Sequence, residues 1–153
     1  MSRRALLTLV AASALALSGC AHPLVVDPAP YAADPDCAEV MLAVPTAVGG
    51  LEMRGTTSQA TQAWGSEYEI VARCGVEPPG PTTERCVTVE TPAASVDWLV
   101  SETADARVAV TFGRSPALEL TVPTVRADEA VGDVLAELSP AAARAPSNGL
   151  ECS

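Results

Sequence analysis

Few side chains in this sequence are of the types that carry out acid–base or covalent catalysis. All nine basic residues are arginines, which excludes Schiff-base and serine–lysine chemistry. The single histidine, His22, lies in a proline-rich stretch two residues after Cys20, where we expect a solvated linker residue. A serine or cysteine nucleophile would therefore lack a histidine base in the folded domain, and no GxSxG or GxxxxGK[ST] motif is present. The sequence predicts a protein that is not an enzyme and that uses no cofactor.

Carboxylates are the remaining candidates for catalysis. Glu67 and Glu69 share one face of a predicted strand, and Asp97 adjoins a tryptophan; glycoside hydrolysis needs a pair of such groups. Exposed strand carboxylates are usually only solvated, so a carboxylate-based cell-wall hydrolase ranks last among the alternatives. Two acidic groups could attract calcium: Asp34 with Asp36, and Asp128 with Glu129 and Asp133. Acids at helix N-termini explain both groups better, so no metal site is predicted.

Two tryptophans could contact a partner. Trp98 aligns with Val96 and Val100 in a predicted strand, which favours a core position, whereas for Trp64 both a core and a surface position remain open. A half-exposed tryptophan suits recognition of a protein or a glycan. We therefore take Trp64, Trp98 and Asp97 as candidate binding residues and expect an exposed patch around Trp64 and the adjoining strand edge.

Composition restricts the class of protein and the class of partner. Nineteen acidic residues against nine basic ones give a formal charge of −10, and affinity for nucleic acid comes largely from basic side chains. No nucleic-acid partner is therefore expected. With 48% hydrophobic and 18% charged residues the chain is too apolar to be disordered, and its 153 residues fit one domain.

The N-terminus predicts a bacterial lipoprotein signal peptide. Arg3 and Arg4 form a positive region, and Ala5–Leu17 is an apolar run too short to span a bilayer. Leu17–Cys20 then looks like a lipobox, in which the Cys20 thiol receives a diacylglyceryl group. The arginine pair also partly resembles a twin-arginine export signal, but we prefer the general secretion route. The predicted location is the extracytoplasmic face of the cell membrane.

The predicted chain has three parts, and cleavage before Cys20 would remove the first. Residues 1–19 are the signal peptide, residues 20–33 are the lipidated cysteine with a Pro/Ala tether, and residues 34–153 are one domain with a loose C-terminal tail. Prolines keep the tether extended and prevent a helix. The mature chain keeps seven arginines against nineteen acids, a formal charge of −12. Because an anionic leaflet repels such a domain, acyl chains such as palmitate must hold it at the membrane.

The remaining cysteines predict two disulfides. An even number of cysteines outside the cytoplasm is typical of a disulfide framework, and no CxxC pair or nearby histidine supports a metal site. Three pairings are possible. A helix lying on the sheet could join Cys37 to Cys74. A disulfide from Cys152 to Cys86 would hold the loose C-terminal tail on the domain, so we favour these two bonds.

Two helices are predicted from apolar stripes. Asp34 is the expected N-cap of the first, which begins with Pro35 and Asp36, and Pro45 ends it. Thr124 is the expected cap of the second, and Ser139–Pro140 stops it. The two stripes are Cys37, Val40, Met41 and Val44, and Ala130, Val131, Val134, Leu135 and Leu138.

Alternating apolar residues predict four or five strands, beginning with Tyr68–Cys74. The last two are joined by a turn at Gly113–Pro116, with Val108, Val110 and Phe112 facing inward. The stretch from Gly49 to Gln62 is interpreted as loop or a poorly formed helix. The predicted fold is α+β: a four- or five-stranded, mostly antiparallel sheet with two helices covering one face, stapled by disulfides.

The order of several short motifs resembles that of a known family. The motifs are Asp36-Cys37-Ala38, Ala63-Trp64-Gly65, Arg73-Cys74-Gly75-Val76 with prolines after it, Val96-Asp97-Trp98, Val110-Thr111-Phe112 and Leu120-Thr121-Val122-Pro123. Over residues 34–138 they resemble DUF3515, an actinobacterial family of secreted or lipid-anchored proteins of unknown function.

The resemblance implies an envelope protein of a high-GC bacterium and carries no active site to transfer. It also implies that Cys37 and Cys74 are the family's shared pair, while Cys86 and Cys152 depart from the family's pattern. The sequence therefore favours a non-enzymatic lipoprotein that binds an envelope protein or a glycan at the outer face of the membrane. The alternative is a small-molecule or glycan-binding carrier, although the Ala/Val-rich core argues against a large cavity.

Overall fold

The computed structural model describes residues 22–153, apart from the side chains of residues 127–130. The predicted signal peptide (residues 1–19) and the predicted lipidation site Cys20 lie outside the described residues. Asp128 and Glu129, considered above as calcium ligands, likewise have no described side chains.

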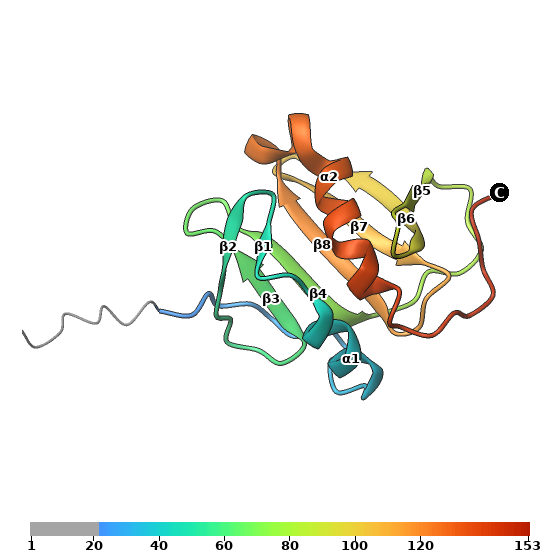
Figure 1. Cartoon of the computed structure of the whole chain (residues 1–153), viewed down its shortest axis with the longest axis horizontal. Coiled ribbons are helices and arrows are strands. Elements are labelled where there is room, and N and C mark those ends of the chain that lie inside the picture. The colour runs from blue at the N-terminus through green and yellow to red at the C-terminus, as the bar shows by residue number, and fades with distance from the viewer. Residues whose placement is uncertain (1–21) are drawn as a thin grey trace, which may run out of the picture.

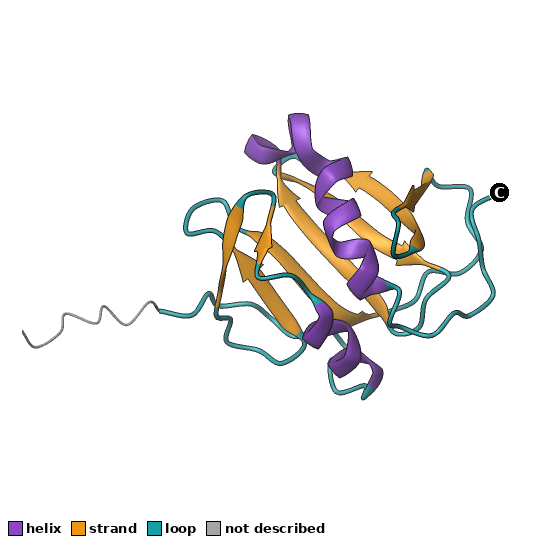
Figure 2. Cartoon of the chain, in the orientation of Figure 1, coloured by secondary structure: helices purple, strands orange, loops and turns teal. Residues whose placement is uncertain are grey.

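An antiparallel sheet of eight strands forms the centre of the domain, and α1 and α2 lie on one of its faces (Figures 1 and 2). The strand order is β1-β2-β3-β4-β8-β7-β6-β5. The elements are α1 (Asp36–Ala43), β1 (Ala47–Val48), β2 (Leu51–Arg54), β3 (Thr61–Trp64), β4 (Ile70–Val76), β5 (Cys86–Glu90), β6 (Ser95–Glu102), β7 (Ala106–Phe112), β8 (Ala117–Pro123) and α2 (Thr124–Ala142). The predicted α+β class, with helices on one face, is confirmed, whereas the predicted number of strands is too low.

The strands missing from the prediction are β1, β2 and β3. The prediction of loop or irregular helix for residues 49–62 is wrong, because Gly49 and Gly50, at φ of 56° and 72°, make a tight turn between β1 and β2. β3 then pairs with β4 over four residue pairs. These strands have only two to four residues, too few for alternation to be visible, and pairing with a neighbour supplies their hydrogen bonds.

The predicted orientation of β7 is also wrong. Trp98, on the helix-covered face, pairs with Thr111, so Ala109 and Thr111 face the helices, while Val108, Val110 and Phe112 face the opposite side. Alternation along a strand identifies the residues that share a face but not which face is covered. On the opposite side Val110 packs against a second apolar cluster, formed by Ala29, Ala32, Val76 and Ala117.

The start of α1 lies one residue later than predicted, because the helix begins at Asp36 and Pro35, not Asp34, occupies the N-cap position. The Asp34 carboxylate accepts a hydrogen bond from the Asp36 N–H at 2.9 Å, which supplies an acceptor for a free N–H group of the first turn. Cys37 and Val40 are buried against the sheet, and the helix ends at Ala43, shortly before Pro45.

The ends of α2 differ from the prediction. Thr124 is the first helical residue rather than the cap, and Pro123 precedes it without a side-chain capping bond. Pro140 does not stop the helix, which continues to Ala142. Because Pro140 stands in the last turn, its missing N–H removes only one late bond, and the Ala143 N–H resumes the ladder to the Ser139 carbonyl at 2.9 Å.

Both predicted disulfides are present, Cys37–Cys74 and Cys86–Cys152, with Cα–Cα distances of 5.6 and 5.7 Å. The first joins α1 to β4 inside the main core. The second joins the start of β5 to the C-terminal tail.

Residues 22–33, predicted as a tether, form no helix, but they pack on the domain and make a turn at residues 30–33. Leu24 forms a parallel bridge with Thr56, and Ala29 and Ala32 are buried against the helix-free face of the sheet. This segment is therefore part of the folded domain.

Ser139 is expected to contribute measurably to stability. It is fully buried, accepts a hydrogen bond from Trp98 Nε1 at 3.2 Å and donates to the Leu135 carbonyl at 2.7 Å. Ser139→Ala leaves the indole N–H without an acceptor, so we expect a loss of about 1–3 kcal/mol in the free energy of unfolding, measured by urea denaturation. Ser66→Ala, at an exposed position, is the control; equal stability of the two variants would contradict the prediction.

Candidate functional site

Neither tryptophan forms the exposed patch that the sequence predicted. Trp64 and Trp98 both have no exposed surface, so the expectation of a binding patch around Trp64 is wrong. The Trp64 indole Nε1 donates to the Pro45 carbonyl at 2.9 Å, in the segment that follows α1. The core position favoured for Trp98 is confirmed. The burial of Trp64 follows from the pairing of β3 with β4, which the sequence did not indicate.

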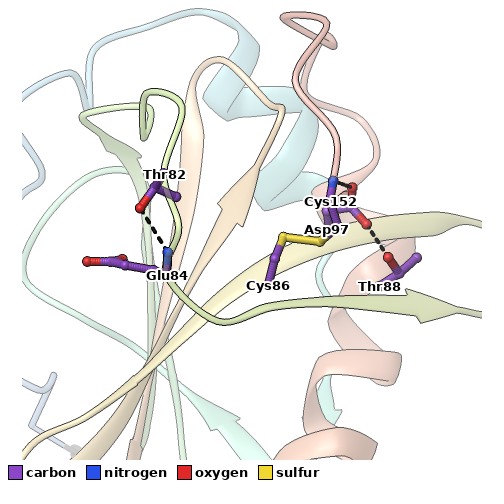
Figure 3. Close-up of a disulfide and its surroundings, with 6 residues drawn as sticks. All are labelled: Thr82, Glu84, Cys86, Thr88, Asp97 and Cys152. Carbon is purple, nitrogen blue, oxygen red and sulfur yellow. Dashed lines mark hydrogen bonds between the residues drawn. A yellow bond between two sulfur atoms is a disulfide. The ribbon is translucent and has the colours of Figure 1, made fainter.

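Asp97 is the one candidate binding residue that lies at the surface, and it holds the C-terminal tail. Its carboxylate accepts a hydrogen bond from the Thr88 hydroxyl at 2.6 Å and one from the Cys152 N–H at 2.7 Å (Figure 3). The Cys86–Cys152 disulfide lies beside this pair of bonds. Both carboxylate oxygens of Asp97 are thus engaged in structure.

A polar pocket of about 370 Å³ opens next to Asp97. Its lining includes Ser95, Arg114, Ser147 and Glu151. The Arg114 guanidinium donates to the Ala145 carbonyl at 3.1 Å and so also fastens the chain after α2. The pocket is lined by hydroxyl and charged groups and by parts of the tail itself.

Asp97 does not lie near the other two predicted carboxylates, Glu67 and Glu69. Glu69 forms an ion pair with Arg54 at 2.6 Å, and Glu67 lies beside it in the loop before β4. Asp97 lies on β6, three strand spacings from β4, which corresponds to about 14 Å. A pair that hydrolyses glycosides needs its carboxyl groups within roughly 5–9.5 Å of each other. Asp97 therefore does not form such a pair with Glu67 or Glu69.

The remaining candidates show no ligand geometry. Among the residues that the structure describes, no three metal-binding side chains converge. His22 is exposed, and its carbonyl accepts a hydrogen bond from Arg54 at 2.9 Å. Within residues 22–153, no helix is long and apolar enough to cross a bilayer.

A smaller pocket of about 280 Å³ contains the one described group whose pKa is clearly shifted. The Tyr31 hydroxyl donates to the Glu77 carboxylate at 2.7 Å. This hydrogen bond, together with the negative charge of Glu77, raises the pKa of Tyr31 above its ordinary value, because both favour the neutral phenol.

We expect Glu77→Gln to lower the pKa of Tyr31. A raised folded-state pKa means that this contribution to stability is complete below the unfolded-state pKa and is lost as the pH rises through the raised value. Titration of tyrosinate absorbance measures the change, and subtraction of the Tyr31→Phe curve isolates Tyr31. An unchanged Tyr31 titration in Glu77→Gln would show that the hydrogen bond does not act on this group.

An open groove lies on the helix-covered face, between α2 and strands β5 to β7. Its volume is about 460 Å³. Its apolar lining comes from the sheet and from the helix and consists of Val87, Val100, Val131 and Leu135. Its charged lining consists of Arg85, Glu102 and Arg107. Arg107 pairs with Glu102 at 2.6 Å. Arg85 is exposed and has no side-chain partner among the residues that the structure describes.

The groove borders β5, which is an edge strand of the sheet. The Val100 N–H donates to the Arg85 carbonyl at 3.2 Å, and the Thr91 N–H to the Ala94 carbonyl at 2.8 Å. This register turns the N–H and C=O groups of Thr88 and Glu90 away from β6. Within the described part of the chain, no strand pairs with these outward groups. We call this edge, with the groove beside it, the β5 site.

The β5 site was missed because its existence depends on strand order. The sequence shows the alternation of Val87 and Val89 but not that β5 ends the sheet. The available signal was Arg85 directly before a strand of alternating valines that carries no proline.

Comparison with known proteins gives one match. A family model described as "Protein of unknown function (DUF3515)" matches residues 4–147, nearly the whole chain. No curated protein and no solved structure matches the chain.

Proposed function

Because the chain belongs to the DUF3515 family, whose function is unknown, we propose a function from its own geometry. The protein is a lipid-anchored, non-enzymatic binding protein at the extracytoplasmic face of the cell membrane. Its domain binds an extended segment of an envelope protein at the β5 site. The lipobox-like Leu17–Cys20 supports the anchor, and the open edge of β5 supports the binding mode.

The open edge of β5 is the observation that carries this proposal. Unpaired strand edges pair readily with other chains, and natural proteins usually protect them with prolines, lysines, bulges or very short strands. The opposite edge, β1, has only two residues, whereas β5 has five, with no proline and no bulge and with one charged residue, Glu90, at its end. An edge left open in this way is suited to strand addition by a partner.

The groove supports a proposal for the chemistry of the partner. A strand added to β5 would bond to the outward groups of Thr88 and Glu90, and alternate side chains would point toward the helix-covered face. An apolar side chain there would meet Val87 and the α2 side of the groove. The Arg85 guanidinium would pair with a carboxylate. We therefore propose an extended partner segment that carries apolar residues at alternate positions and an acidic residue.

Two substitutions at one position test this binding mode. Thr88→Pro removes the outward N–H without removing a bond to β6, since proline is tolerated on an edge strand whose N–H faces solvent. Thr88→Ala removes the same hydroxyl bond to Asp97 but keeps the N–H, so it is the matched control. The tagged chain is crosslinked in intact cells, and the captured material is identified by mass spectrometry.

The proposal requires that one protein be captured with the natural chain and with Thr88→Ala but lost with Thr88→Pro. Arg85→Glu is expected to reduce the capture of that protein as well. Capture that is equal in all variants would overturn the β5 site.

The alternative function is a small-molecule or glycan-binding carrier. The observation that favours it is the polar pocket beside Asp97, lined by Ser95, Ser147, Arg114 and Glu151. Capture of glycan or lipid alone, unaffected by Thr88→Pro, would favour this alternative. Ser95→Trp, which places a large side chain at this pocket, would then abolish the capture.

A further inference from the structure

The first described residues are fixed to the end of the sheet. The Leu24 N–H donates to the Gly55 carbonyl at 2.8 Å, and the Thr57 N–H donates to the Leu24 carbonyl at 3.0 Å. The Arg54 guanidinium donates to the His22 carbonyl at 2.9 Å. These bonds hold the backbone in place from His22 onward.

The rest of the segment is held along its length. The Val26 N–H donates to the Thr57 hydroxyl at 3.1 Å, and the Tyr31 N–H donates to the Gly75 carbonyl at 2.8 Å. Ala29 and Ala32 are buried in the second apolar cluster. Residues 22–33 therefore cannot act as a free spacer, and the His22 end keeps one position relative to the domain.

Cys20 is only two residues before His22. Two residues span at most about 7 Å, so a lipid on Cys20 would lie close to the bonds that hold His22 and Leu24. The N-terminal segment of the described chain, drawn in blue, begins at one end of the molecule in Figure 1, and β5 and the C-terminus lie toward the other end. A lipid at Cys20 thus selects which end of the domain meets the bilayer.

The surface around His22 has side chains suited to a bilayer interface. Val25 is 80% exposed and Tyr68 is 61% exposed. Arg54 bonds to the His22 carbonyl and pairs with Glu69, the residue after Tyr68, and the Arg126 guanidinium donates to the Tyr68 carbonyl at 2.6 Å. Tyrosine and arginine are both favoured at the level of lipid headgroups.

We propose that the surface formed by His22–Val25, Arg54–Gly55 and Glu67–Glu69, the anchor end, rests directly on the lipid bilayer and that the β5 site points away from it. This inference rests on the lipid anchor of the proposed function. It assigns the bilayer as the partner of the anchor end. It also means that the β5 site faces partners located beyond the membrane surface.

Nitroxide quenching in vesicles tests this orientation. The lipidated full chain is reconstituted in vesicles that contain a headgroup-nitroxide phosphatidylcholine. One fluorophore is attached through Ser66→Cys, in the loop at the anchor end, or through Thr83→Cys, in the loop before β5. Both positions are small, exposed hydroxyl residues, so they form a matched pair. A compact domain of this length has a radius of gyration of about 14 Å, so its opposite ends lie at least about 28 Å apart. A probe at the far end is therefore well away from the headgroups.

We expect the Ser66 probe to lose most of its fluorescence and the Thr83 probe to keep it. A flexible Gly/Ser insertion between Ala21 and His22 should abolish the difference, because the domain then tumbles relative to the anchor. Equal quenching of the two probes in the uninserted chain, with lipid on Cys20 verified by mass, would overturn the orientation alone. Absence of lipid on Cys20 would overturn the anchor and the orientation together.

Discussion

Replacing Cys37 and Cys74 together by alanine is expected to lower the free energy of unfolding by about 4 kcal/mol, from the entropy of a closed loop of this length. The two cysteines are 37 residues apart, and both are buried in the main core. Such a loss is a large part of the stability of a small domain. Urea denaturation followed by tryptophan fluorescence measures it, since Trp64 and Trp98 are both in that core.

The second disulfide is the control for the location of the effect. Cys86 and Cys152 are 66 residues apart, so the loop model predicts a loss of similar size when both are replaced by alanine. Hydrogen exchange should separate the two variants. The first should lose protection in α1, and the second in the tail after α2. Stability equal to that of the natural chain in the first variant, or unchanged exchange in α1, would contradict the prediction.

Gly75→Ala is expected to detach the N-terminal segment from the sheet. Gly75 has a φ of 94°, which a residue with a Cβ rarely adopts, and that Cβ would lie 2.4 Å from the Tyr31 carbonyl group. The backbone strain alone costs on the order of 1–3 kcal/mol. The bond from the Tyr31 N–H to the Gly75 carbonyl and the burial of Ala29 and Ala32 should also be lost. We expect a lower free energy of unfolding and fast hydrogen exchange at residues 29–32.

Gly80→Ala is the matched control for this substitution. A Cβ at Gly80 meets no atom within 4 Å, and its backbone is not in the left-handed region. It should leave both stability and hydrogen exchange unchanged. Slow exchange at residues 29–32 in Gly75→Ala would mean that the segment is held by something other than its contact with Gly75.

In the vesicle experiment Gly75→Ala has a further consequence. If the segment is released from the sheet near Gly75 but stays bonded at Leu24, the Ser66 probe should remain quenched, because the anchor end is held by Gly55 and Thr57. That result would assign the proposed orientation at the bilayer to the bonds of Leu24 and His22 rather than to the packing of Ala29 and Ala32.

The features that the sequence determined by itself are local or depend on few partners. Four cysteines after Cys20 and their positions in the predicted elements led to the two disulfides. The stripe of Cys37 and Val40 led to a helix on the sheet, and the Gly113–Pro116 turn led to the β7–β8 hairpin. Periodicity and turn residues report on such features because they act over a few residues.

Only the tertiary structure decided which surfaces are covered and which are open. The alternation along β7 showed that Val108 and Val110 lie on the same side of the sheet. It did not show whether that side is the one covered by α2, because this depends on where α2 packs. Trp64 is buried because a short strand pairs with β4, and the β5 edge is open because, within residues 22–153, no strand follows it in the sheet. Burial and edge position are properties of contacts between segments far apart in the chain, which local patterns do not encode. Because of those contacts, the candidate site lies at the edge of β5 and not at Trp64, where the sequence predicted it.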